Sequence, residues 1–552
     1  MTSGPLIVQS DRTVLLEVAH PEAADARHGL AVFAELERAP EHIHSYRITR
    51  LGLWNARAAG HSAAEMMATL TKYSKFPVPQ SVSIDIEETV ARYGRLTIGR
   101  DDDGVLTLTA SDAAVLAEIS RAKKVAELLF ERRGDHTFVV QAWARGQLKQ
   151  ELLKLGWPAD DQAGFTPGEP YDITLSTDGW QLRPYQQEAI DSFAEAGSGV
   201  VVLPCGAGKT IVGAGAMART AAKTLILVTN TVSARQWRTE LLARTSLTED
   251  EIGEYSGQSK EIKPVTIATY QILTAKRKGA YAHLAVLDAL DWGLVVYDEV
   301  HLLPAPVFKL TAELQARRRL GLTATLVRED GREGDVFSLI GPKRFDAPWK
   351  EIEAQGFISP AECFEVRVDL PHDDRLRYAA AADDERFRLA ASAPAKHEIV
   401  RALVARHAGE RILVIGQYLD QIAELAEDLD APQLTGSTPV DEREELYAAF
   451  RSGELQVLVV SKVANFSVDL PEASVAIQVS GSFGSRQEEA QRLGRLLRPK
   501  KSGRTATFYT LVARDTVDQE FAQNRQRFLA EQGYSYTILD GVDVLDPAHP
   551  AP

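Results

Sequence analysis

An apolar run that ends in a glycine-rich loop restricts the fold of this chain more than any other feature. Residues 200–203 are apolar, Gly206 and Gly208 follow, and Lys209 comes next. Glycines let backbone N–H groups close around phosphates, and the lysine brings a positive charge to the outer phosphates. We therefore expect a strand, a phosphate-binding loop and a helix. The expected nucleotide contacts are Pro204, Cys205, Gly206, Ala207, Gly208, Lys209 and Thr210.

A second apolar run is followed by the acidic residues that a phosphate-binding loop needs for hydrolysis. Residues 294–297 are typical of a buried strand, and Asp298 and Glu299 follow them directly. The Thr210 hydroxyl and the Asp298 carboxylate can hold Mg²⁺ between them. Glu299, one residue further along, can polarise an attacking water. The two motifs together predict a site that hydrolyses a nucleoside triphosphate, with Lys209 as its phosphate-binding cation.

The composition is that of an ordinary globular protein. The chain has 552 residues, 45% hydrophobic and 25% charged, with a formal net charge of -15. That charge argues against a generally basic coat but allows a local basic groove. The two cysteines, Cys205 and Cys363, form no disulfide framework or zinc spacing, which suits a reducing cytosol. With no signal-peptide pattern and no apolar run of ~18 residues, we expect a cytoplasmic protein without membrane contact.

The distribution of apolar runs predicts four regions. Residues 1–104 are expected to form a small helical or winged-helix-like module, and 105–165 a compact α/β module with helices at 113–119, 125–131 and 145–155. Residues 173–345 and 346–545 each alternate strand and helix patterns, which indicates parallel sheets covered on both faces. The expected strands are 200–203, 225–228, 265–268, 294–297 and 320–323, then 411–415, 457–460, 475–479 and 506–511.

The second α/β region lacks a phosphate loop, so we expect it to complete the site from across a cleft. On a helix, Gln491, Arg495 and Arg498 would share one face. A guanidinium group that reaches a γ-phosphate stabilises transition-state charge. These three residues are therefore candidate catalytic residues. From residue 540 onwards we expect no regular structure.

The order of these motifs resembles that of XPB-type DNA repair helicases of superfamily two, bacterial branch. The resemblance covers nearly the whole chain and is tightest over 180–540. The segment 182–186, with Arg183 and Gln186, is similar to the adenine-reading segment. The segment 466–471 is similar to the fifth of the sequence motifs that define these helicases, and its Asp469 is expected to contact the nucleotide. The segment 321–325, with Thr323 and Thr325, looks like the motif that couples hydrolysis to movement, and Arg328, Glu329 and Asp330 match the family's RED element.

This resemblance implies a 3′-to-5′ ATP-dependent DNA motor with two RecA-like domains, which uses ATP and Mg²⁺. It also implies a damage-recognition-like module, here 105–165, and a thumb-like helical insertion, here 371–394. The insertion mixes basic and aromatic residues, so Arg377, Tyr378 and Arg388 are candidate DNA contacts. Its interleaved acidic residues leave a plain solvated hairpin open as the alternative.

Other candidate DNA contacts follow predicted strands, where hydroxyl, amide and basic groups suit phosphates. Trp237 is expected to pack in the core and not to stack on a base. His301 is expected to bridge the γ-phosphate side of the site to the coupling motif and is counted with the catalytic residues. The candidate contacts are Arg235, Gln236, Thr269, Tyr270, Ser461 and Lys462.

The leading hypothesis is thus an ATP-driven DNA helicase or translocase in repair. A duplex translocase that does not separate strands, or an ATP-gated DNA clamp, remains the alternative. An RNA helicase is disfavoured, because its DEAD tetrad would have Asp in place of His301. Expected partners are single-stranded, 3′-tailed or bubble DNA, with a repair nuclease as a candidate. The motor is expected to act as a monomer and to join the nucleoid when it is engaged on DNA.

Overall fold

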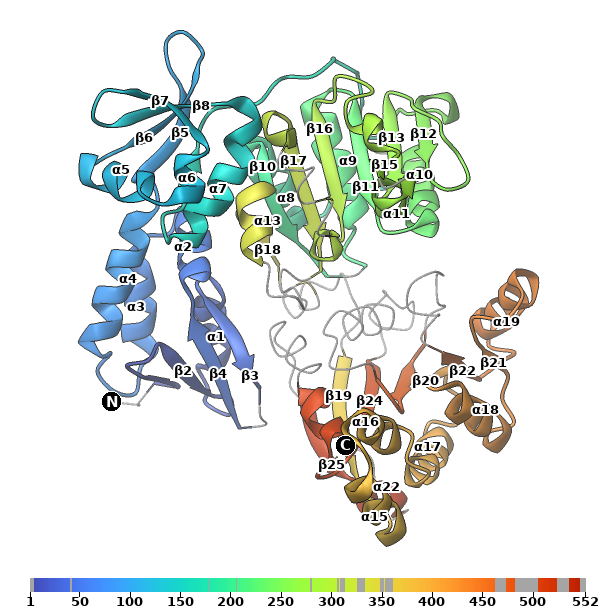
Figure 1. Ribbon diagram of the computed structural model, residues 1–552. Helices are drawn as coiled ribbons and strands as arrows, with labels where there is room; N and C mark the ends of the chain where they lie inside the picture. The colour runs from blue at the N-terminus through green and yellow to red at the C-terminus, as the bar shows by residue number, and fades with distance from the viewer. Residues whose placement is uncertain are drawn as a thin grey trace.

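The computed structural model shows an α/β protein whose described residues form four sheets of four or more strands (Figure 1). Its described residues are 4–39, 42–176, 178–204, 206–277, 280–304, 307, 313–324, 333–347, 352, 361–461, 473–481, 505–523 and 536–546. In this part of the chain no helix is both long enough and apolar enough to cross a membrane.

The N-terminal module contains a four-stranded antiparallel sheet in the order β1-β2-β4-β3. Alternating residues of its strands, such as Val14 and Leu16, are fully buried beneath the helices. The module is therefore richer in strands than the winged-helix-like expectation. Its elements are β1 (Leu6–Val8), β2 (Thr13–Glu17), α1 (Ala23–Ala31), β3 (Ala34–Arg38), β4 (Ile43–Ile48), α2 (Arg50–Ala58), α3 (Ala63–Tyr73) and α4 (Gln80–Arg92).

The second module is a five-stranded sheet in the order β7-β8-β6-β5-β9. Because β5 pairs with β6 and β9, the boundary expected at residue 104 lies earlier, before residue 96. The helix expected over 125–131 is wrong beyond residue 126, where the helix ends, and from residue 129 pairing with β8 makes a strand. The elements are β5 (Leu96–Arg100), β6 (Leu106–Ala110), α5 (Ala113–Ser120), α6 (Lys123–Ala126), β7 (Leu129–Arg133), β8 (Thr137–Val140), α7 (Arg145–Lys154) and β9 (Ala159–Asp161).

The first motor domain is a seven-stranded parallel sheet in the order β12-β13-β11-β16-β17-β10-β18. Its central strands are apolar along their length because helices cover both faces (Figure 1). The strands are β10 (Ser198–Val202), β11 (Thr224–Val228), β12 (Ile252–Tyr255), β13 (Val265–Thr269), β16 (Leu294–Asp298), β17 (Arg318–Thr323) and β18 (Lys343–Asp346). The main helices are α8 (Pro184–Ala196), α9 (Lys209–Thr220), α10 (Thr231–Arg244), α11 (Tyr270–Thr274) and α13 (Glu333–Leu339).

The second motor domain repeats this plan in the order β21-β22-β20-β23-β24-β19-β25, which confirms the predicted fold class. Its strands are β19 (Ala361–Val368), β20 (Ile412–Gly416), β21 (Gln433–Leu434), β22 (Val457–Ser461), β23 (Val475–Gln478), β24 (Ala506–Ala513) and β25 (Tyr536–Asp540). Its helices are α15 (His372–Ala380), α16 (Asp383–Ala391), α17 (Ala395–Arg406), α18 (Leu419–Asp428), α19 (Val440–Ser452) and α22 (Gly541–Leu545). The expectation of no structure after 540 is wrong for α22, because the Asp540 carboxylate caps that helix at the Val542 N–H.

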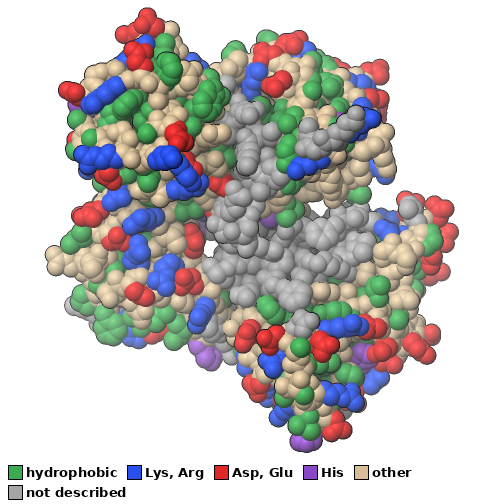
Figure 2. Space-filling view, viewed as in Figure 1, with side chains coloured by type: hydrophobic (Ala, Val, Ile, Leu, Met, Phe, Trp, Pro, Cys, Tyr) green, Lys and Arg blue, Asp and Glu red, His purple; other side chains and the backbone are tan. Residues whose placement is uncertain are grey.

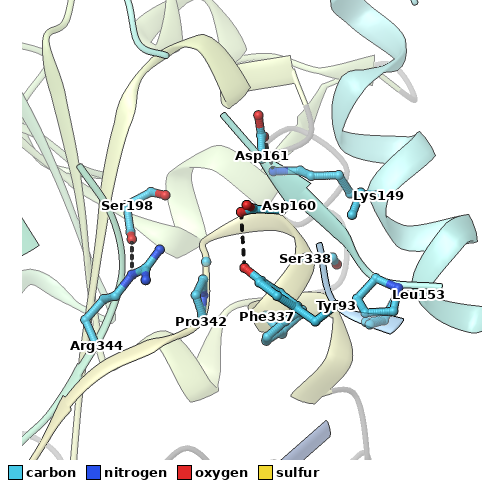
Figure 3. A pocket seen from close by; sticks show the side chains of 13 residues that line it. Tyr93, Lys149, Leu153, Asp160, Asp161, Ser198, Phe337, Ser338, Pro342 and Arg344 are labelled. Atoms are coloured by element: carbon cyan, nitrogen blue, oxygen red, sulfur yellow. Dashed lines mark hydrogen bonds and ion pairs between the residues drawn. The ribbon is translucent and has the colours of Figure 1, made fainter. Parts of the chain in front are cut away.

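The N-terminal modules dock on the β18 edge of the first motor sheet. Gln150 Nε2 donates to Asp335 Oδ1 at 2.8 Å, and the Lys343 N–H donates to the Asn55 side chain at 3.0 Å. Beside this contact, Tyr93 donates to Asp160, and Arg344 Nε donates to the Ser198 carbonyl 3.0 Å away (Figure 3). The buried Asp161 carboxylate is bound by Arg145 at 2.7 Å and Lys149 at 2.8 Å. Burial lowers the pKa of Lys149 to about 8, although Asp161 opposes the shift. This buried group belongs to the second module, and Lys149 and Asp161 line a pocket together with Phe337 and Ser338 of the first motor domain.

Candidate active site

The glycine-rich loop joins β10 to α9, as the apolar run before it predicted. Gly206 and Gly208 have φ of +83° and +86°, a region that favours glycine. Gly208 stands immediately before α9, so the first N–H groups of that helix open toward the loop. A side chain at Gly208 would also lie 2.4 Å from the Gln186 amide. The loop thus has the backbone geometry that a phosphate site requires.

The segment expected to read adenine holds the back of this loop. The Tyr185 hydroxyl and the Gln186 amide each donate to the Ala207 carbonyl at 2.8 Å. The Arg183 N–H donates in turn to Gln186 Oε1 at 3.0 Å. Gln186 is only 2% exposed, so in this arrangement its side chain supports the loop. A contact between adenine and Arg183 or Gln186 stays a prediction.

Strand β16 ends at Asp298, and Glu299 follows it at the same edge of the sheet as the loop. Lys209 Nζ lies 3.3 Å from Glu299 Oε1, which joins the two motifs directly. Glu299 has φ +48°, in the left-handed region that glycine favours, and this turns its carboxylate out of the line of the strand. Its N–H donates to Asp298 Oδ1 at 3.0 Å. Lys209, Asp298 and Glu299, three of the seven predicted catalytic residues, therefore lie together.

The neighbouring carboxyl groups have opposite pKa shifts. Burial, reinforced by the charge of Glu299, raises the pKa of Asp298 to about 6. Burial also opposes ionisation of Glu299, but the Lys209 ammonium and His301 outweigh it and hold the pKa of Glu299 below its usual range. The pair therefore favours an ionised Glu299, the form that can polarise a water.

His301 connects this pair to the next strand. Its Nδ1 lies 2.6 Å from the Thr323 hydroxyl and 3.5 Å from Glu299 Oε2. Thr323 is fully buried at the end of β17, beside β10. The bridge expected from the sequence thus has a matching set of contacts, and its role in coupling stays a prediction.

Two aromatic side chains fix Asp298 in place. The Trp237 indole N–H donates to Asp298 Oδ2 at 2.9 Å, and the Tyr270 hydroxyl donates to the Asp298 carbonyl at 2.8 Å. The core packing expected of Trp237 is present, since it is 1% exposed, but its contact with the acidic motif was missed. An indole N–H needs a partner when it is buried, which is the only signal the sequence offered.

The donor set fits Mg²⁺. Thr210 stands at the second position of α9, and Asp298 ends the strand that faces it. Hydroxyl and carboxylate oxygens are the hard ligands that Mg²⁺ prefers. Each Asp298 oxygen already accepts one hydrogen bond, which orients the carboxylate and leaves a lone pair on each oxygen.

The predicted DNA contacts divide by exposure. Arg235 and Gln236 are exposed on α10, where a nucleic-acid backbone can reach them. Three hydroxyl-bearing candidates are buried, which leaves their side chains little exposed surface in this arrangement, and their contact with DNA stays a prediction. Those buried candidates are Thr269 at 2%, Tyr270 at 3% and Ser461 at 2% exposure.

The insertion at 371–394 forms the expected helical hairpin, α15 and α16. Arg377 is exposed on it, with Asp374 3.7 Å away. The Tyr378 hydroxyl accepts a hydrogen bond from the Val517 N–H, so it anchors the hairpin to the motor. Arg388 is paired with Asp420 at 2.6 Å. Of the three predicted contacts, Arg377 is the one presented most openly.

Several predicted site residues lie outside the described residues, so their placement is not discussed. They are Cys205, Thr325, Arg328, Glu329, Asp330, Lys462, Asp469, Gln491, Arg495 and Arg498. On the face shown in Figure 2, Lys and Arg side chains are interspersed with Asp and Glu over the described surface. Such mixing is consistent with the net charge of -15.

Three family models match the chain. The model described as ERCC3/RAD25/XPB C-terminal helicase matches residues 352–549, which include the second motor sheet. The model described as type III restriction enzyme, res subunit, matches 179–328, which include the phosphate loop and the acidic motif. A model described as helicase conserved C-terminal domain matches 6–134.

Whole-length relatives show the same similarity. A protein of Kineococcus radiotolerans named DNA 3'-5' helicase XPB is 66% identical over 99% of this chain and 98% of that protein. One of the same name from Mycobacterium tuberculosis is 62% identical over 99% of this chain and 100% of its own length. A third, from Antonospora locustae, is named general transcription and DNA repair factor IIH helicase/translocase subunit XPB. It is 34% identical over 98% of this chain and 82% of that protein.

Proposed function

This chain belongs to the XPB family of DNA helicases, and from that premise we propose that it is an ATP-dependent 3′-to-5′ DNA helicase that acts in repair. The observation that carries the proposal is the meeting of Lys209, Asp298 and Glu299 at one edge of the first motor sheet. Relatives of nearly equal length support the direction of movement and the DNA substrate by their names.

The residues of the site have distinct roles in this reaction. Backbone N–H groups between Gly206 and Lys209 bind the β- and γ-phosphates, and Lys209 neutralises their charge. Glu299 accepts hydrogen bonds from the attacking water and aligns it with the γ-phosphorus. Lys209 keeps Glu299 ionised while ATP is absent, since the two side chains are 3.3 Å apart. ATP binding then draws the lysine to the phosphates and releases the carboxylate for the water.

Mg²⁺ would be held by Thr210 and Asp298, where it would offset the negative charge of the phosphates. The two hydrogen bonds that Asp298 accepts through its carboxylate keep the oxygens oriented for that role. Arg495 and Arg498 remain the proposed transition-state contacts from the second motor domain. Arg328 of the RED element remains the proposed link to strand separation.

The DNA substrate, the partner protein and the oligomeric state are proposed from the family and from the chemistry of the exposed side chains. Single-stranded and 3′-tailed DNA are the proposed substrates, bound through phosphates by Arg235, Gln236 and Arg377, and therefore with little sequence preference. A repair nuclease is the proposed partner. We further propose a monomeric motor in the cytoplasm, associated with the nucleoid while it is engaged on DNA.

Parallel ATPase and strand-displacement assays test the proposal. ATP turnover is measured with no nucleic acid, single-stranded DNA, blunt duplex, 3′-tailed duplex, 5′-tailed duplex and RNA. We expect stimulation by single-stranded DNA and displacement on the 3′-tailed duplex alone. Displacement only from a 5′ tail would overturn the direction. Stimulation by duplex without any displacement would establish a duplex translocase, and DNA retention with no turnover would establish an ATP-gated clamp.

A further inference from the structure

We propose that Trp237 and Tyr270 are positioning residues that connect the two DNA-facing segments of the first motor domain to Asp298, and so make ATP hydrolysis respond to DNA. This inference rests on the proposed function. Both aromatic residues come from segments that the sequence assigns to DNA, yet both side chains are buried and point at the acidic motif. Each makes one hydrogen bond to the same residue.

Trp237 lies between the nucleotide loop helix and the acidic strand. Its indole N–H, which can only donate, binds Asp298 Oδ2 at 2.9 Å. The far edge of its ring packs on α9, where a Cβ on Gly213 would be 2.4 Å from Trp237 Cη2. Gly213 is one helical turn after Lys209, so the ring spans from the phosphate-binding helix to the metal-binding carboxylate.

The opposite face of α10 is turned to solvent. Arg235 precedes Trp237 by two positions, which is about 200° around an α-helix. Arg235 and Gln236 are accordingly exposed while Trp237 is 1% exposed. A strand that binds Arg235 and Gln236 therefore moves the helix whose other face holds the Asp298 carboxylate. No flexible segment intervenes, because all three residues belong to one helix, α10.

Tyr270 makes the matching contact from α11. Its hydroxyl donates to the backbone carbonyl of Asp298 at 2.8 Å, and its side chain is 3% exposed. The next residue, Gln271, is exposed. Trp237 thus holds the Asp298 side chain while Tyr270 holds its main chain. Because both its side chain and its main chain are held, Asp298 changes position when α10 or α11 moves relative to β16. A residue that senses DNA needs this dependence on the DNA-facing helices.

Trp237→Phe tests the side-chain contact, since it keeps an aromatic ring and removes the N–H. Trp292→Phe is its matched control, because Trp292 is also buried in this domain and donates its indole N–H to the Val286 carbonyl. Turnover is measured against DNA concentration. We expect Trp237→Phe to lower the DNA-saturated rate by on the order of 10- to 100-fold, the effect of one hydrogen bond to a charged group. The half-saturating DNA concentration should stay within about twofold.

A binding measurement separates this role from a general loss of activity. Affinity for a fluorescent ADP analogue is measured with Mg²⁺ and with EDTA. Trp237→Phe should weaken binding at least about fivefold with Mg²⁺ and leave the EDTA value unchanged, because its target is the metal-binding carboxylate. If Trp237→Phe does not fold, Gly213→Ala displaces the same ring from the other side and should give the same pattern.

Tyr270→Phe removes only the hydroxyl, with Tyr171→Phe as control, because the Tyr171 hydroxyl bonds Glu251 outside the site. Tyr270→Phe should reduce stimulation by DNA at least about fivefold. The inference is overturned if each variant matches its control, or if Trp237→Phe raises the half-saturating DNA concentration as Arg235→Ala should. A wild-type protein without DNA-stimulated turnover would instead refute the proposed function.

Discussion

The imidazole Nδ1 of His301 and the hydroxyl of Thr323 are 2.6 Å apart. This contact joins the acidic motif to the end of β17, and through the 3.5 Å approach of His301 to Glu299 it reaches the proposed water-polarising carboxylate. A change at Glu299 during hydrolysis therefore has a short route to the segment that follows Thr323. That segment leads into the RED element.

Thr323→Val should uncouple hydrolysis from movement. Valine keeps the shape and suits a strand but cannot bond His301. We expect ATP turnover to stay within about fivefold of wild type and DNA displaced per ATP to fall by about tenfold. Strand displacement and ATPase are measured on the same 3′-tailed substrate. Thr266→Val, which removes a hydroxyl that donates to the Lys263 carbonyl, is the control. Equal loss of both activities in Thr323→Val would contradict the coupling role.

Glu299→Gln should retain nucleotide binding and lose hydrolysis. Glutamine has the size of glutamate but cannot accept a proton from water, so turnover should fall on the order of 10²-fold or more. Lys209→Ala should instead weaken nucleotide binding, since it removes a charge from the phosphates. Equilibrium binding and single-turnover hydrolysis separate the two effects. Turnover near the wild-type rate in Glu299→Gln would remove Glu299 from catalysis.

Asp161→Asn should destabilise the junction between the second module and the motor. The change leaves Arg145, 3% exposed, and Lys149, 8% exposed in its side chain, without their shared carboxylate. Breaking such a buried pair costs about 3–5 kcal/mol. Hydrogen exchange across α7 and α13 measures the effect. Asp160→Asn, which removes the neighbouring charge and keeps an oxygen to accept the 3.3 Å hydrogen bond from Tyr93, is the control. Addition of Lys149→Met to Asp161→Asn should restore part of the loss.

The N-terminal module should lose stability in mild acid because of His44. Burial, with the nearby charge of Arg27, lowers the pKa of His44 from 6.5 to about 4. Between these values the unfolded chain binds the additional proton, so stability falls as pH drops from 6.5 to 4, by up to about 3 kcal/mol. Below pH 4 both states are protonated and this loss ends. Hydrogen exchange in β2 and β4, corrected for intrinsic rates, measures it. An unchanged pH dependence in His44→Gln would exclude this residue as the cause.

The central strands of both motor sheets were predictable because burial on two faces imposes apolar runs. The runs at 225–228 and 294–297 lie within β11 and β16. Edge strands carry no such pattern. Lys343–Asp346 is a strand through its pairing with β10, and Ala159–Asp161 through its pairing with β5. Their formation depends on partners distant in the sequence.

The residues of the site also separate into those that the local sequence predicts and those that depend on distant parts of the chain. Lys209, Asp298 and Glu299 were predictable because local loop geometry and strand ends fix them. The bond from Trp237 to Asp298 joins residues 61 positions apart and has no local signature. The exposure of Tyr270 also could not be inferred from the sequence. Its position just after a strand suggested a contact with DNA, but its hydroxyl group faces Asp298.

The position of β18 at the end of the first motor sheet has a consequence for solubility. The Lys343 N–H, which faces away from β10, donates to the Asn55 side chain, and Arg344 donates to the Ala58 carbonyl. An uncovered edge strand offers its backbone to other chains and promotes aggregation. Helix α2 therefore covers this part of the edge. A motor produced without residues 1–172 would present that edge bare, and its tendency to precipitate would reflect a missing cover and not a defect in the nucleotide site.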